Sequence, residues 1–61
     1  MTAPERALFS PKNAADYLDV STETLRRLVA RGELLAVKLG GSTRYARVDL
    51  DALVERLRRS A

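Results

Sequence analysis

The chain has 61 residues, which is enough for one small domain, and a buried catalytic cleft is not expected at this size. Hydrophobic residues make up 46% and charged residues 31%, a mixture typical of a folded chain rather than a disordered one. The absence of Cys and His excludes disulfides, thiol nucleophiles, imidazole bases and nearly all zinc or transition-metal sites. We therefore expect a binding module that is not an enzyme and holds no metal or cofactor.

Basic residues concentrate in the middle of the chain. Eleven Lys and Arg against eight Asp and Glu give a net charge of +3. Residues 21–47 hold six basic and two acidic side chains, whereas residues 1–20 hold two and three, and residues 48–61 hold three of each. This excess indicates a polyanionic partner, although charge alone is equally typical of a solvated surface.

A first helix is predicted from Pro11 to about Leu18. Ser10 can cap this helix. Pro11 is favourable at the first helical position, because the N–H that proline lacks would make no hydrogen bond within the helix there. Residues 8–9 are expected to precede it as an extended lead-in or a first strand. The apolar face of this helix consists of Ala14, Ala15 and Leu18, with Tyr17 beside them.

A second helix is predicted from Thr22 to about Arg31, after a three-residue turn that ends at Ser21. Ser21 is a favourable N-cap, and Gly32 is a typical C-terminal stop. The apolar spacing i, i+3, i+4 is carried by Leu25, Leu28 and Val29. Two helices joined by so short a turn make a helix-turn-helix, in which the second helix can enter the DNA major groove.

A β-hairpin is predicted next. Residues 35–39 have the pattern of a strand, with Val37 and Leu39 on one face and Lys38 on the other. Residues 40–42 are expected to form a tight turn in which two glycines supply positive φ, and residues 43–46 to form the returning strand. A hairpin directly after such a second helix is the wing of many DNA-binding domains.

A third, amphipathic helix is predicted from about Val48 to Arg58, beginning near residues 47–49. Its apolar face, with spacing i, i+3, i+4, i+7, consists of Leu50, Leu53, Val54 and Leu57. The predicted fold class is therefore α+β, a small winged helix-turn-helix: a helix-turn-helix followed by a two-stranded β-hairpin wing and a C-terminal helix. We expect this domain at residues 8–58, a flexible N-terminal arm at 1–7 and a C-terminal tail at 59–61.

Membrane association is not expected. No apolar run approaches the roughly 20 residues that a membrane span needs, and the N-terminal residues lack the apolar core of a signal peptide. The sequence therefore predicts a cytoplasmic protein.

The second helix carries the main candidate binding residues. If its apolar residues face the core, the 100° step per residue turns Thr22, Arg26 and Arg27 outward, together with Glu23 and, at the margin, Ala30. Arginine can fork onto guanine O6 and N7 or clamp a phosphate, and hydroxyls suit phosphate oxygens. The alternative interpretation is an ordinary solvated helix with a Glu23–Arg27 ion pair.

The hairpin tip carries a second group of donors. Lys38, Ser42, Thr43 and Arg44 surround a turn without bulky side chains, which suits insertion beside a phosphate backbone or into a minor groove. The alternative is a solvated hairpin whose glycines serve only its turn. Since both interpretations need the glycines, only Lys38 and Arg44 distinguish them.

Two further features have structural interpretations. The basic end of the third helix, Arg56, Arg58 and Arg59, is interpreted as cations that meet the helix dipole, with phosphate or partner-protein contact as the alternative. Tyr17 and Tyr45 are isolated, so we interpret them as aromatics at the edge of the core rather than platforms for base stacking.

A family pattern runs along about residues 8–57. It consists of Ser10-Pro11-Lys12, Ala14-Ala15, Leu18, Val20-Ser21, Thr24-Leu25-Arg26-Arg27-Leu28, Arg31-Gly32-Glu33-Leu34, Lys38-Leu39-Gly40, Arg44-Tyr45, Asp49-Leu50 and Leu53. This pattern resembles the excisionase-type winged helix-turn-helix family, which is related to the DNA-binding domain of mercury-resistance-type regulators. Asp19 departs from it, since the family often has Gly in this turn, but Asp tolerates the left-handed geometry.

The resemblance implies a phage or prophage recombination directionality factor. Such a protein binds direct repeats beside an attachment site, cooperatively and side by side, bends the DNA and helps an integrase to excise the prophage. The resemblance puts recognition-helix positions at Thr22, Thr24, Arg26 and Arg27 and wing positions at Ser42, Thr43 and Arg44. With the helix start and the first hairpin strand, the expected DNA-binding residues are Ser21, Thr22, Thr24, Arg26, Arg27, Lys38, Ser42, Thr43 and Arg44.

The expected partners are double-stranded DNA, neighbouring copies of the chain and an integrase. The second helix is expected in the major groove, and the wing at the minor groove or the backbone. Two alternatives stay open: a small transcription regulator of the same fold that acts at a promoter, and a protein-interaction adaptor whose basic face meets an acidic partner.

Overall fold

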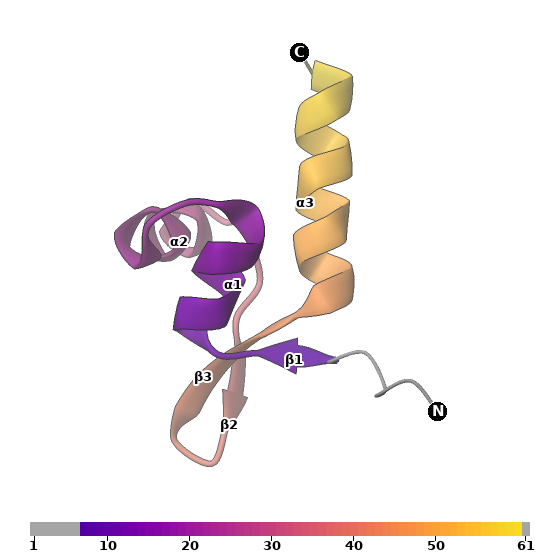
Figure 1. Ribbon diagram of the computed structural model, residues 1–61. Helices are drawn as coiled ribbons and strands as arrows, with labels where there is room; N and C mark the ends of the chain where they lie inside the picture. Colours follow the sequence, from indigo (N-terminus) through magenta and orange to yellow (C-terminus); the bar gives the residue numbers. More distant parts are fainter. Residues whose placement is uncertain (1–6, 61) are drawn as a thin grey trace.

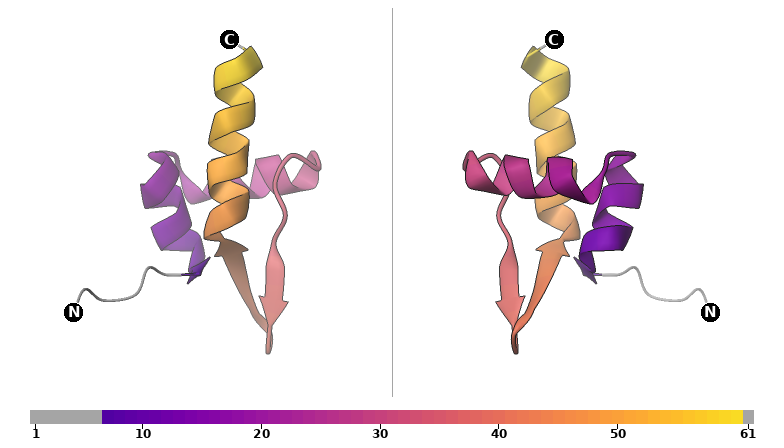
Figure 2. Two further views of the ribbon diagram at one scale, coloured as in Figure 1. Left: turned by 90° about the vertical axis from the view of Figure 1, so that its right-hand side faces the viewer. Right: turned by 90° about the vertical axis from the view of Figure 1, so that its left-hand side faces the viewer.

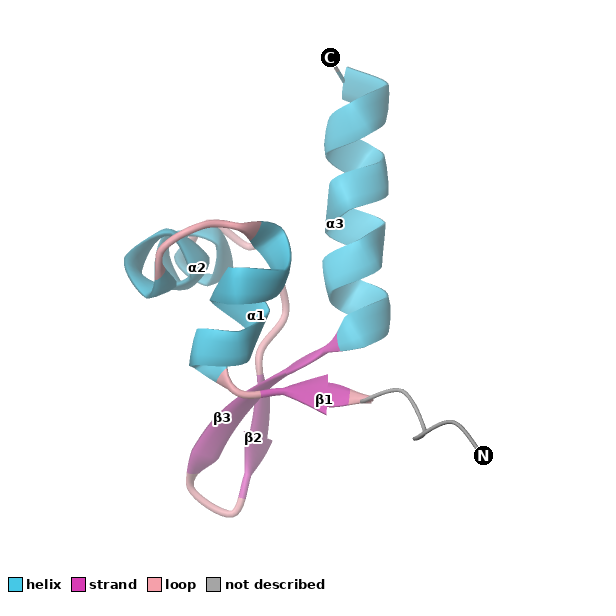
Figure 3. Cartoon of the chain, viewed as in Figure 1, coloured by secondary structure: helices cyan, strands magenta, loops and turns pink. Residues whose placement is uncertain are grey.

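The computed structural model describes residues 7–60 (Figure 1). The arm expected at residues 1–7 therefore lies, apart from Ala7, outside the described residues, as does Ala61. The described chain forms three helices and three short strands, coloured by type in Figure 3. In chain order they are β1 (Leu8–Phe9), α1 (Pro11–Leu18), α2 (Thr22–Ala30), β2 (Val37–Leu39), β3 (Ser42–Ala46) and α3 (Arg47–Ser60).

Local side-chain chemistry sets the ends of α1 and α2. The Ser10 hydroxyl accepts a hydrogen bond from the Asn13 N–H at 3.2 Å, and the Ser21 hydroxyl accepts one from the Thr24 N–H at 3.1 Å. Asp19 ends α1 in the left-handed region, at φ 58° and ψ 46°. The predicted caps are therefore confirmed, and Asp19 adopts the conformation for which the family often has Gly.

The strands form one antiparallel sheet in the order β1-β3-β2. The hairpin of β2 and β3 pairs Lys38 with Thr43, and β1 adds a short third strand that pairs Phe9 with Tyr45. Gly40 and Gly41, at φ 57° and 88°, alone make the turn, because a two-residue turn of this kind needs positive φ at both positions. The predicted wing is thus confirmed.

Two predicted boundaries in the hairpin are wrong. Ser42 pairs with Leu39 and so begins β3, instead of closing a three-residue turn. β2 begins at Val37 rather than at Leu35. The reason is that Leu34 is buried in the core beside α3, so the chain around Leu35 follows α3 and joins β3 only later.

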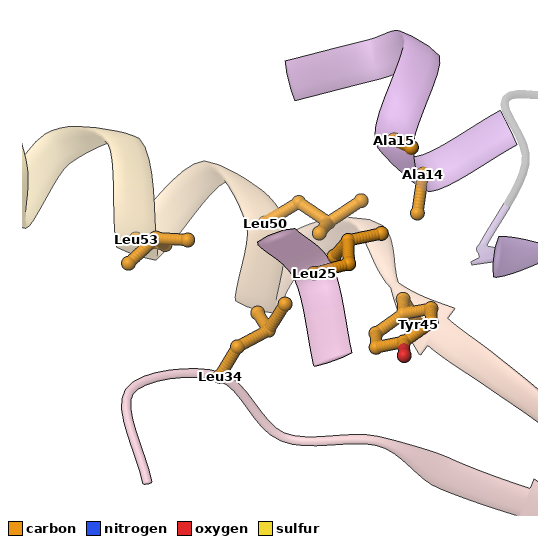
Figure 4. Close-up of a cluster of buried hydrophobic side chains, with 7 residues drawn as sticks. All are labelled: Ala14, Ala15, Leu25, Leu34, Tyr45, Leu50 and Leu53. Carbon is orange, nitrogen blue, oxygen red and sulfur yellow. The ribbon is translucent and has the colours of Figure 1, made fainter. Parts of the chain in front are cut away.

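The core lies where all three helices meet the inner face of β3 (Figure 4). No polar or charged residue is buried within the described residues. Half-buried apolar residues, among them Leu18, Leu28 and Val29, pack around this core. The buried side chains are Ala14, Ala15, Leu25, Leu34, Tyr45, Leu50 and Leu53.

The third helix differs from its prediction at its distal end. α3 runs to Ser60, two residues beyond the expected end. Only Leu50 and Leu53 of its predicted apolar face are buried, whereas Val54 and Leu57 are exposed, because no described segment covers these two side chains. In residues 7–60, no helix has the length and apolar character needed to cross a bilayer.

A side-chain hydrogen bond joins α1 to α3. The Tyr17 hydroxyl donates a hydrogen bond to Asp51 Oδ1 at 2.5 Å, and Arg47 Nη1 lies 3.7 Å from Asp51 Oδ2. The Tyr17 ring packs edge-on against Phe9, with ring centroids 5.0 Å apart. Of the two tyrosines interpreted as core-edge aromatics, Tyr45 is buried and Tyr17 lies at the surface.

Candidate nucleic-acid interface

The outward face of α2 is arranged as its periodicity predicts. Leu25 is fully buried, and every residue predicted to point outward is exposed. The right-hand view of Figure 2 shows α2 in front, the hairpin of β2 and β3 below it and α3 behind. The outward face of α2 therefore lies on the side of the molecule away from α3. Its residues are Thr22, Glu23, Arg26, Arg27 and Ala30.

Side chains from α2 and from the wing meet in one groove. Thr22 and Arg26 line it from α2, Thr43 and Tyr45 from β3, and Pro11 from the start of α1. The groove has a volume of about 170 Å³ and opens to solvent. Two of the predicted helix residues and one predicted wing residue therefore lie together around a space that a small group of a partner can enter.

The two arginines of α2 differ in their partners. Arg26 makes no hydrogen bond or ion pair with any residue of the described chain. Arg27 Nη2 lies 3.6 Å from Glu23 Oε2, the pair that the spacing predicts, and both side chains are largely exposed. Because an exposed pair of this kind is weak, Arg27 can exchange Glu23 for an anionic partner, while Arg26 is already free to accept one.

The wing residues divide between its two faces. Lys38 Nζ donates a hydrogen bond to Thr43 Oγ1 at 3.2 Å, and both lie on the face that Tyr45 turns toward the helices. Alternation along β3 puts Ser42 and Arg44 on the opposite face, where Arg44 Nη1 donates to its neighbour's carbonyl, Thr43 O, at 2.9 Å. The structure therefore brings Lys38 and Thr43 toward α2, but not Ser42 and Arg44.

Two predicted site residues are engaged in the start of α2. The hydroxyls of Ser21 and Thr24 lie 3.0 Å apart, and the Thr24 N–H donates to the Ser21 hydroxyl. Thr24 is also half-buried rather than outward. In the described structure these two side chains therefore hold the helix end, while Thr22 between them faces the groove.

Sequence reasoning missed two residues of the groove. From the sequence, Pro11 is predicted only to start a helix, and Tyr45 only to lie at the edge of the core. Tyr45 could have been found by strand alternation, since it follows Thr43 by two positions and so shares its face. The position of Pro11 depends on how α1 crosses β3, for which the sequence carries no signal. Within residues 7–60 no three His, Cys, Asp or Glu side chains gather as a metal site would require.

The short turn between α1 and α2, the wing that follows them in the chain and the shared groove define a winged helix-turn-helix. A family model described as a helix-turn-helix domain matches residues 8–58. An excisionase of Mycobacterium phage D29 is 50% identical to the chain over 50 residues, which cover 82% of each protein. No solved structure matches the chain significantly. The chain belongs to the excisionase-type helix-turn-helix family.

Proposed function

We propose that this chain is a non-catalytic, sequence-selective DNA-binding protein that acts as an excisionase. In this proposal α2 enters the major groove, and the wing lies against the minor groove or the backbone. The observation that carries the proposal is the groove where Thr22, Arg26 and Thr43 meet. It presents a free guanidinium and two hydroxyls from two different elements on one exposed face, and these are donors that bind phosphate oxygens and base edges.

The proposal includes cooperation between copies, which we expect from the small interface, and DNA bending, which we expect from the placement of α2 and the wing. A single module of this kind buries roughly 600–1,000 Å² on DNA, so one copy binds modestly and useful occupancy requires neighbours on direct repeats. α2 and the wing lie on the same side of the molecule, and their simultaneous contact with adjacent grooves favours a deformed duplex (Figure 2). In this proposal the bent array assists an integrase in excising a prophage in the bacterial cytoplasm; the name of the excisionase relative supports the excision role alone.

A gel-shift titration tests this proposal. A fluorescent fragment of the native locus is titrated with the protein through a salt series, in the presence of unrelated competitor DNA. We expect successive discrete shifts that resist the competitor. If one copy neutralises about three to five phosphates, the slope of log K against log salt is about −3 to −5, because each phosphate contributes about −0.9. Circularly permuted fragments then report the bend, and an excision assay with the integrase reports the biological role.

Other outcomes would support the open alternatives. A slope near zero, or no binding, favours the protein-interaction adaptor. Footprints at a promoter without any effect on excision favour the transcription regulator. One strictly independent monomer per site in sedimentation would contradict cooperative binding.

A further inference from the structure

The second half of α3 carries an apolar stripe that the core does not use. Leu50 and Leu53 are buried, but the stripe continues with Val54 and Leu57, whose exposed fractions are 41% and 53%. Every residue from Val54 to Ser60 is exposed. In Figures 1 and 2 the last turns of α3 extend beyond the level of α1 and α2. We call Val54 and Leu57 the distal stripe.

The distal half of α3 makes few contacts with the rest of the described chain, and none of its residues is buried. Arg56 Nη2 donates a hydrogen bond to the carbonyl of Glu33, in the loop after α2, at 2.7 Å. Glu55 pairs with Arg58 at 3.1 Å and with Arg59 at 3.4 Å. Each of these contacts is weak, but together they support the helical conformation of the last turns, which carry the distal stripe.

Charge around the distal stripe selects the kind of surface that can cover it. The segment 54–60 contains three arginines and one glutamate, and Arg58, four residues after Val54, lies beside the stripe. A second copy that packed the same segment against this one would bring like charges together, which disfavours self-pairing. DNA could bind the arginines but would leave the apolar side chains exposed. An apolar surface with an acidic border complements both features.

The position of the stripe separates it from the candidate nucleic-acid interface. In the right-hand view of Figure 2, α2 lies in front and α3 behind it. The groove is lined by residues of α1, α2 and β3 and by none of α3. A partner on the distal half of α3 would therefore leave the outward face of α2 open.

We propose that the distal stripe docks an amphipathic helix of a partner protein, with its apolar ridge against Val54 and Leu57 and its acidic flanks against the arginines. This is packing of one helix along another through residues spaced i, i+3, i+4 and i+7. The affinity of this contact should be modest, because only a few side chains near the end of one helix would be buried in it. The partner binds independently of DNA.

The test uses two synthetic peptides and the intact chain. Both peptides have about 18 residues, long enough to form helix, with leucines at i, i+3, i+4 and i+7; one carries Glu at its flanking positions and the other carries Lys. Each is titrated into ¹⁵N-labelled protein and followed by NMR. We expect the Glu peptide to shift the resonances of residues 54–60, and the Lys peptide to leave them unchanged. Equal binding of both peptides, no binding of either, or shifts confined to another surface would overturn the proposal.

Variants separate this surface from the DNA-binding face. The double variant Val54→Gln/Leu57→Gln keeps good helix formers on exposed positions and is expected to weaken the Glu peptide at least about tenfold. Val48→Gln is the matched control, because Val48 is 68% exposed on another face of the same helix and its loss should change nothing. The single variant Leu57→Gln serves if the double variant proves unstable. Both distal variants should bind DNA as the native chain does, so the failure of either proposal leaves the other testable.

Discussion

Arg26 and Arg27 are neighbours of one type with different surroundings. Arg26 lines the groove and has no partner among residues 7–60, whereas Arg27 is paired with Glu23. A guanidinium without an internal partner can be committed to a ligand at no cost to the fold. Variants of these two residues can therefore show whether an arginine on α2 contributes to DNA binding or to the stability of the fold.

We predict that Arg26→Ala weakens specific DNA binding by about 1–3 kcal/mol, the value of one good arginine contact to a base. The free energy of unfolding should change by less than about 0.5 kcal/mol, because the side chain is exposed and has no partner in the described chain. Fluorescence anisotropy and thermal melting measure the two quantities. Arg27→Ala should also weaken binding, but less, since Arg27 must first leave Glu23. If either substitution unfolds the chain, that arginine is structural.

Tyr17 is the residue whose titration should report on the fold. Its hydrogen bond to the Asp51 carboxylate, helped by desolvation and by the charge of Asp51, raises the pKa of Tyr17 above its ordinary value of 10.0, and Arg47 opposes the rise in part. A raised pKa means that the folded chain favours the neutral phenol. The stabilisation is therefore complete below pH 10 and is lost as pH rises through the folded pKa.

We predict that the native chain is more stable than Tyr17→Phe at neutral pH, and that this difference shrinks above pH 10. Chemical denaturation of both proteins between pH 7 and about 11 gives the difference directly, because the other titrating groups are common to both. A difference that stays constant through this range would show that folding does not raise the pKa of Tyr17.

At the scale of elements, the start of α2 combines a cap with a position beside the candidate interface. Ser21→Ala removes the acceptor for the Thr24 N–H and should lower the stability of the chain by about 1 kcal/mol. Ser21→Asp preserves the cap, because aspartate is an equally good N-cap, but adds a negative charge near the DNA. We expect Ser21→Asp to melt near the native temperature and to bind DNA more weakly. Native affinity in Ser21→Asp would show that Ser21 lies away from the phosphates.

The helices could be predicted because their signals are local. A capping serine, a proline or glycine at the proper end and apolar spacing of three and four residues all lie within a few positions of one another. The facing of α2 followed from Leu25, Leu28 and Val29 for the same reason. The predicted start of β2 is wrong because Leu34 packs in the core beside α3. This contact joins segments far apart in the sequence, so local patterns do not predict it.

The candidate site was only partly predictable. That Thr22 and Arg26 share a face follows from the helical period, but their meeting with Thr43 depends on how the hairpin is set against α2. The apolar periodicity correctly predicts a helix at α3. The same periodicity is expected whether the apolar face packs on the rest of this chain or on a separate protein. Val54 and Leu57 are therefore predicted as apolar positions but not as exposed ones.

For the whole molecule, the limiting feature is the core of seven side chains, of which three leucines are the largest fully buried. A domain of this size has a free energy of unfolding of only about 3–9 kcal/mol. We predict that Leu50→Ala, which leaves a cavity where α3 meets the other helices, costs about 2–5 kcal/mol, a large part of that stability, and strongly lowers the melting temperature. Circular dichroism against temperature measures this loss.

Leu57→Ala is the matched control for that experiment. It makes the same chemical change in the same helix, but at a position that is 53% exposed, so its effect on the melting temperature should be small. A similar loss in both variants would mean that the distal half of α3 is covered in solution, by another copy or by a segment outside the described residues.

Because the core is small, the lifetime of the protein in the cell should depend on the fraction of copies that are bound to a ligand. A ligand that binds only the folded chain at a hundred times its dissociation constant adds about 2.7 kcal/mol, a large part of the stability of such a domain. In a domain of this length that gain raises the melting temperature by roughly 10–20 °C. Copies without a ligand spend more time unfolded and are open to proteolysis for that fraction of time. The number of binding sites in the cell would then set how much of the protein persists there.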